Sequence, residues 1–151
     1  MNTLFDSRFG IADGAGTFRT TTSGIVGRAL ARRVGLSSDV ETAARLEVVP
    51  EEDGDRWIRT FGSRRWSTVV SRTASGITER IGPIDLRFDI ELRPAGAVAT
   101  LSEMRIGPVS LGRPLGLRVS AVTARSSDRL RVLVTVGAAR RQLMTYRGDL
   151  R

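Results

Sequence analysis

The 151-residue chain contains no cysteine and no histidine. The lack of Cys excludes disulfide bonds and thiolate chemistry. The lack of His removes imidazole metal ligands and the most common general base of enzymes. An enzyme would have to use Asp, Glu, Arg, Tyr, Ser or a bound cofactor, and Glu79, Asp85, Tyr146 and several Arg could serve in acid–base chemistry. Strand carboxylates that alternate with Arg are, however, more typical of cross-strand ion pairs. The composition therefore favours a non-catalytic protein with no cofactor and no metal site.

Lysine is also absent, so all 24 basic residues are Arg and the net charge is +8. Arg binds phosphate and carboxylate groups bidentately, which would suit an anion-binding surface. A bias in nucleotide composition would equally replace Lys by Arg, and the Arg residues are scattered along the chain, which favours this second interpretation. No signature of a nucleic-acid-binding module is present, so we do not expect a nucleic acid as partner.

Long apolar runs are missing as well: none approaches the roughly 20 residues that cross a membrane. The N-terminal MNTLFDSRFG lacks the basic-then-apolar pattern of a signal peptide. We therefore expect a cytoplasmic protein without a transmembrane segment. The length fits a single domain, 1–151, in which residues 1–15 form an irregular start.

One stretch, Ser23–Gly35, has the pattern of a helix. Ser23 can cap its start, and Gly35 suits the left-handed position after its end. Its apolar residues recur at helical spacing, and they are Ile25, Val26, Ala29, Leu30 and Val34. Such a basic amphipathic helix could lie on a membrane surface, but packing against a sheet is the more common use of this pattern.

The centre of the chain, Trp57–Gly82, reads WIRTFGSRRWSTVVSRTASGITERIG and consists of three strand-like runs separated by two short turns. Short links of this kind predict antiparallel hairpins. In Ile84–Arg93 apolar and charged residues alternate, so we expect burial of its apolar set, which is Ile84, Leu86, Phe88, Ile90 and Leu92. Gly107–Gly116, rich in Gly and Pro, is predicted to be a loop.

These patterns predict an α+β protein made mainly of antiparallel β-structure. A sheet of about eight to nine strands in meander order, with one apolar face, curls and tends to close into a barrel. We expect the N-terminal amphipathic helix to pack on the concave side of this curled sheet.

Four segments, RWIRTFGSRRWST, ITERIGP, LGRPLG and YRGDL, resemble an uncharacterised family called domain of unknown function 4166. The resemblance extends over residues 24–151. The family tends to have Phe where Trp66 stands and Trp where Asp149 stands, and its His-containing N-terminal segment has no counterpart in this chain. Its members often lie C-terminal to a Rossmann-type dehydrogenase-like domain. The resemblance therefore implies an accessory domain that docks on a dehydrogenase-like partner or self-associates, and it implies no catalytic residue.

A curled sheet with one short helix and few aromatic residues favours another function, the binding of a small hydrophobic or amphipathic ligand. The predicted cavity lies between the helix and the sheet, with aromatic and polar residues at its mouth. The predicted ligand-binding residues are Trp57, Arg59, Trp66, Arg80, Tyr146, Ile25, Ala29 and Leu30. A separate anion-binding cluster is predicted from Arg64, Arg65 and Arg147, because each lies next to or near an aromatic residue in GSRRW and TYRG. If the cavity is instead filled by core side chains, the two Trp residues are simply part of the core.

Overall fold

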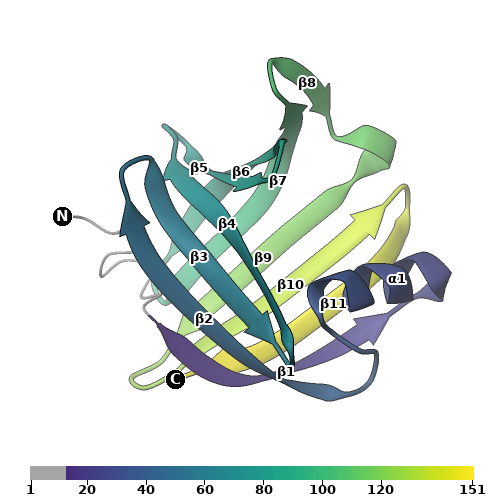
Figure 1. Cartoon of the computed structure of the whole chain (residues 1–151), viewed down its shortest axis with the longest axis vertical. Helices are drawn as coiled ribbons and strands as arrows, with labels where there is room; N and C mark the ends of the chain where they lie inside the picture. The colour runs from purple at the N-terminus through teal and green to yellow at the C-terminus, as the bar shows by residue number, and fades with distance from the viewer. Residues whose placement is uncertain (1–12) are drawn as a thin grey trace.

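The computed structural model describes residues 13–151, which form a closed antiparallel β-barrel with one α-helix (Figure 1). Within these residues ten strands close the barrel, and an eleventh, β8, pairs with β7 alone. The elements in chain order are β1 (Gly14–Thr22), α1 (Gly24–Val34), β2 (Glu41–Glu51), β3 (Gly54–Phe61), β4 (Arg64–Arg72), β5 (Gly76–Ile81), β6 (Ile84–Arg93), β7 (Gly96–Ile106), β8 (Val109–Gly112), the short 3₁₀ turn η1 (Pro114–Gly116), β9 (Arg118–Arg125), β10 (Leu130–Ala138) and β11 (Arg141–Leu150).

The barrel strands follow one another in meander order. β1 to β7 are neighbours in sequence and in space, β9 pairs with β7, and β11 returns to pair with β1. The predicted antiparallel class is confirmed, although the barrel has ten strands rather than eight or nine. β8 and η1 lie in the segment that was predicted to be a loop. Of the predicted irregular start, residues 14 and 15 belong to β1, Asp13 forms a bend, and residues 1–12 lie outside the described residues.

The alternating run Ile84–Arg93 is β6, as predicted, but its apolar residues are not all buried. Phe88 is buried and Ile90 is half-buried, whereas Leu92 is exposed. Leu92 pairs with Ala97 beside the β6–β7 turn, at one end of the barrel. The prediction that all five are buried was therefore wrong: Ile84 and Leu86, like Ile90, are only half-buried, and Leu92 contacts water because it lies at the barrel rim.

The helix α1 forms where predicted, and Gly35 has the expected left-handed conformation (φ 90°). It contacts β11 and β1 through Gly27 and Ala31, while Leu30 and Val34 pack against the core. Three residues of the predicted apolar face are exposed, and they are Ile25, Val26 and Ala29. The helix is rotated relative to the predicted orientation because Gly27 lets its backbone approach β11 closely. A Cβ atom at position 27 would lie 2.0 Å from the carbonyl oxygen of Leu143.

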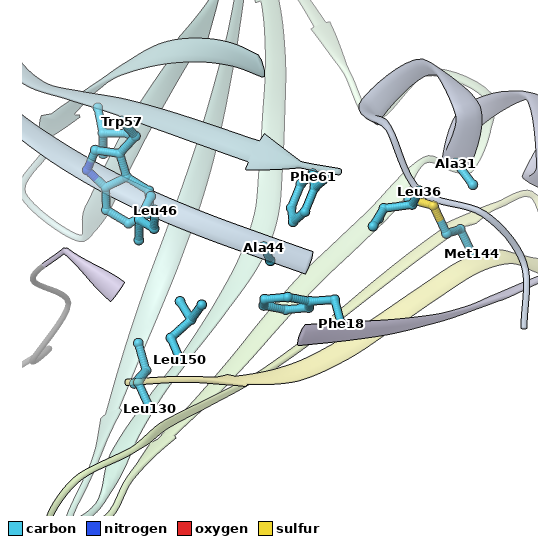
Figure 2. Close-up of a cluster of buried hydrophobic side chains, with 11 residues drawn as sticks. Phe18, Ala31, Leu36, Ala44, Leu46, Trp57, Phe61, Leu130, Met144 and Leu150 are labelled. Carbon is cyan, nitrogen blue, oxygen red and sulfur yellow. The ribbon is translucent and has the colours of Figure 1, made fainter. Parts of the chain in front are cut away.

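The helix lies at the end of the barrel where β1 ends and β11 begins. The Ser23 N–H donates to the carbonyl oxygen of Leu143 at 2.9 Å, and Ala31, Leu36 and Met144 are buried beside one another (Figure 2). The expectation of a helix on the concave side is not confirmed. Because successive strands reverse direction, the same end also carries the β3–β4, β5–β6 and β10–β11 turns and the β7–β9 connection. We call it the helix end.

An aromatic cluster fills the barrel next to the helix. The rings of Phe18, Phe61 and Tyr146 meet edge to face, with centroids 5.8 to 5.9 Å apart. Apolar side chains continue the core along β2, β10 and β11, as Leu46, Leu130 and Leu150 (Figure 2). A cavity lies in the interior between these residues and the opposite wall, formed by β5 to β9.

The close contact at Gly27 predicts an unusual response to mutation. Alanine is the better helix former by about 1 kcal/mol, so Gly27→Ala would stabilise a free helix. Here the added Cβ meets backbone atoms that cannot move aside, and we expect the free energy of unfolding to fall by about 1–3 kcal/mol, as overpacked sites do. Urea denaturation measures the change, with Arg28→Ala on the exposed face as control. A more stable Gly27→Ala protein would contradict this packing.

Candidate functional site

The barrel encloses a cavity of about 220 Å³. Side chains from all ten barrel strands line it, and most of them are aliphatic or aromatic. The smaller ones, Ala97, Ala99 and Ala121, come from β7 and β9 and leave space opposite the aromatic residues of β1, β3 and β4. At one end the lining reaches Ile81, the last residue of β5, so the cavity extends to the helix end.

Arg59 is the central polar residue of this cavity. It lies on β3 between Trp57 and Phe61, and strand alternation points all three side chains inward. The guanidinium carbon lies 5.0 Å from the ring centroid of Trp57 and 4.7 Å from that of Trp66, its cross-strand partner on β4. Two indole faces therefore stabilise the charge by cation–π attraction.

Glu79 on β5 neutralises Arg59. The Arg59 Nη2 to Glu79 Oε1 distance is 2.8 Å, and the two side chains are only 15% and 14% exposed. Thr68 joins them, because its Oγ1 accepts from Arg59 Nη1 at 2.8 Å and donates to Glu79 Oε1 at 2.7 Å. These contacts offset the desolvation of both charges, and they create a compact polar centre in an otherwise apolar interior.

Tyr146 of β11 faces the same centre. The pKa of its phenol is raised to about 12, mainly by burial, with the charge of Arg59 opposing the rise and that of Glu79 adding to it. The phenol is therefore neutral at physiological pH and keeps its proton for donation. Trp57, Arg59, Trp66 and Tyr146 are predicted ligand-binding residues, and the structure brings all four together around one cavity.

The other predicted ligand-binding residues do not reach the cavity. Arg80 lies on the outer face of β5, because Glu79 and Ile81 on either side of it point inward, and it pairs with Asp85 at 2.8 Å. Ile25 and Ala29 are exposed, and Leu30 packs against the core without lining the cavity.

The predicted anion-binding cluster is not assembled either. Arg64 and Arg65 begin β4, whereas Arg147 lies on β11, and β3, β2 and β1 separate the two strands. Four strand spacings of about 4.8 Å place them roughly 19 Å apart along the sheet. Arg65 instead lies 3.5 Å from Glu47 of β2.

Glu79 and Thr68 are the residues of the polar centre that the sequence analysis did not assign to the ligand site. Glu79 was considered only as a possible acid or base. A usable signal was present in ITERI, where Glu79 shares a strand face with Ile77 and Ile81. A carboxylate on an apolar face of a strand indicates a buried charge that requires a partner.

Comparisons of the chain with protein-family models, with curated proteins and with solved structures found no match. Among residues 13–151, no three carboxylates lie close enough together to hold a metal ion. In the same part of the chain no helix has the length and hydropathy to cross a membrane. The cavity and its polar centre form the candidate site.

The ion pair itself can be tested by paired substitutions. Arg59→Met leaves the Glu79 charge buried without its partner, and we expect a loss of about 3–5 kcal/mol in the free energy of unfolding. Arg59→Met combined with Glu79→Leu should cost clearly less than the sum of the two single changes. Urea denaturation of the unmodified protein, the two single variants and the double variant measures this coupling. The exposed pair Glu91 and Arg93 is the control, with an expected coupling below about 1 kcal/mol; equal coupling in both pairs would contradict a buried pair.

Tyr146 is the only tyrosine in the chain, so an ultraviolet titration reports on it alone. We expect its ionisation at about pH 12 rather than near the usual 10.0. The folded state binds the Tyr146 proton more tightly than the unfolded state does. This tighter binding contributes fully to the free energy of unfolding below about pH 10, and its contribution is lost as the pH rises through about 12. Glu79→Gln should lower the pKa, and the exposed Glu91→Gln should not. A folded protein whose tyrosine titrates near 10 would rule out the buried phenol.

Proposed function

We propose that the barrel is a binding module for a small amphipathic ligand. The observation that carries the proposal is an apolar cavity with one polar centre on its wall, built from Arg59, Glu79, Thr68 and Tyr146. Ligand sites of this kind combine an apolar lining with a few polar groups that fix the ligand's orientation. The apolar part of the ligand would occupy the space along the alanines of β7 and β9, and its polar group would contact the polar centre.

The size of the cavity limits the ligand. A cavity of about 150 Å³ accommodates benzene, so 220 Å³ corresponds to roughly nine non-hydrogen atoms by simple scaling. Typical sites for drug-sized molecules begin at about 300 Å³. The proposed ligand is therefore a short alkyl chain or a single ring with one polar substituent, rather than a long-chain lipid.

The polar centre also limits the chemistry of the ligand. Arg59 has five N–H groups, of which two are used by Thr68 and Glu79, so donors remain. Glu79 offers further acceptor capacity, because both of its contacts use Oε1. A carboxylate ligand would be repelled by Glu79, and an ammonium ligand by Arg59. A neutral group that both donates and accepts, such as a hydroxyl or a primary amide, matches the pair best.

The test uses three ligands with the same alkyl chain, which are octan-1-ol, octanoate and octylamine. Both tryptophans of the chain line the cavity, so binding should change their fluorescence. Octan-1-ol should bind most tightly and raise the melting temperature, with a stabilisation of about 2.7 kcal/mol at a hundredfold excess over Kd. In Glu79→Gln the preference should move toward octanoate, because the repelling charge is gone.

A matched pair of variants on β9 provides the control. Ala121→Leu places extra atoms in the cavity and should abolish binding, whereas Ala124→Leu on the outer face of the same strand should not. If none of the three ligands changes the fluorescence or the melting temperature, the ligand-binding function is wrong. The accessory-domain alternative, which the resemblance to the family of unknown function implies, stays a prediction that a dehydrogenase-like partner would have to support.

A further inference from the structure

The charge of the protein is concentrated at the helix end. We take as the helix end the connections at this end of the barrel with two strand residues on either side, which are residues 21–42, 60–65, 80–85, 105–119 and 137–142. These segments contain eleven Arg, namely Arg28, Arg32, Arg33, Arg64, Arg65, Arg80, Arg105, Arg113, Arg118, Arg140 and Arg141, against Asp39, Glu41 and Asp85. The rest of the chain contains 13 Arg and 13 acidic residues. The whole net charge of +8 therefore comes from the helix end.

Most of these Arg residues lack an acidic partner. Arg65, Arg80 and Arg105 pair with Glu47, Asp85 and Glu103. Within residues 13–151 the other eight form no ion pair, and they are Arg28, Arg32, Arg33, Arg64, Arg113, Arg118, Arg140 and Arg141. Their positive charge is therefore available to an external anion.

Exposed apolar side chains are concentrated at the same end. Of the eleven exposed large hydrophobic residues among residues 13–151, eight lie there, namely Ile25, Val26, Val40, Ile81, Ile106, Val109, Leu111 and Leu115. Leu115 is 88% exposed and Ile25 is 78% exposed. Exposed apolar groups gathered in this way are typical of an interaction surface.

The segments that carry these residues are neighbours around the rim. The Ala139 N–H donates to the carbonyl oxygen of Leu115 at 2.7 Å, which joins η1 to the β10–β11 turn. The first residues of β11 contact α1, which carries Ile25 and Val26. In Figure 1 the β7–β8 hairpin, the loop after it, the β10 arrowhead and α1 follow one another down the right-hand side of the barrel.

We propose that the helix end docks on a lipid bilayer that contains anionic headgroups. The unpaired Arg residues would contact headgroup phosphates, and the apolar tips would enter the boundary between headgroups and acyl chains. A fluid lipid surface can adapt to side chains that project from several separate segments. The proposal is independent of the ligand function, but the cavity reaches the same end at Ile81, so a ligand dissolved in the membrane would enter without crossing bulk water.

The experiment is co-sedimentation of the full chain with vesicles, in the absence of any added ligand. Vesicles of phosphatidylcholine with phosphatidylglycerol, at a ratio of about two to one, should bind the protein, and phosphatidylcholine alone should bind it far more weakly. Binding should weaken as salt is added, because the contacts are at the surface. Equal binding to both kinds of vesicle, or binding to neither, would overturn the proposal.

Two triple variants separate the two contributions: one removes three positive charges, and the other removes three exposed apolar side chains. Arg28→Gln, Arg32→Gln and Arg33→Gln together should lower the partition coefficient about a hundredfold, since each surface charge contributes about fivefold. Ile25→Ser, Val26→Ser and Leu115→Ser together should also abolish binding, and these side chains are exposed, so the fold does not depend on them.

Matched controls lie away from the helix end. Arg93→Gln, Arg125→Gln and Arg129→Gln remove the same net charge, and Val49→Ser, Leu92→Ser and Leu133→Ser remove the other three exposed apolar residues. Both controls should bind vesicles within about threefold of the unmodified protein. Equal losses in controls and test variants would overturn the proposal. Binding that needs the Arg set but not the apolar set would also overturn it, and would indicate an electrostatic surface for an acidic protein or a nucleic acid.

Discussion

The structure depends on the pairing of its first strand with its last. β1 forms hydrogen-bonded ladders with both β2 and β11, and this seam converts a long meander into a closed barrel without free edges among the ten strands. Gly148 on β11 lies opposite Phe18 on β1, and a Cβ atom at Gly148 would lie 2.9 Å from the Phe18 ring. The aromatic ring therefore packs over the glycine of the neighbouring strand and begins the core cluster with Phe61 and Tyr146. The same residues therefore close the barrel and contribute to its core.

Closure also explains why the interior contains a cavity. A ten-stranded barrel encloses more volume than a few aromatic residues fill, and the aromatic residues within 13–151 lie mainly on β1, β3, β4 and β11. The opposite wall is lined by small side chains such as Ala97, Ala99 and Ala121. The helix does not fill the space, because the contact between Gly27 and β11 holds it at the barrel end. The empty volume is therefore a consequence of where large and small residues lie around the barrel.

Stability alone does not explain why the polar centre is buried in the barrel. A buried ion pair is often no more stabilising than apolar residues of the same size, so Arg59 and Glu79 contribute little that Leu and Met could not supply. Two indole rings and Thr68 nevertheless hold the pair in one arrangement. This fixed arrangement of Arg59 and Glu79 is consistent with recognition of a polar group. The cavity lining reaches the charged helix end at Ile81 and the opposite end of the barrel at Leu130 and Leu150.

The sequence by itself determined the antiparallel class, the position of the helix along the chain and the inward face of the central strands. Period-two alternation is a local property, and it placed Trp57 and Arg59 on one face and Trp66 on the facing strand. Even Glu79 could have been recognised from its place between Ile77 and Ile81. Tertiary structure alone decided the rest. The rotation of α1 depends on its contact with Leu143, and the separation of Arg64 from Arg147 depends on the strand order. Eleven of the 24 Arg residues, which look scattered along the chain, lie at the helix end with only three acidic residues, because each reversal of an antiparallel barrel returns alternate turns to the same rim. No local pattern encodes that arrangement, since it arises only when the sheet closes.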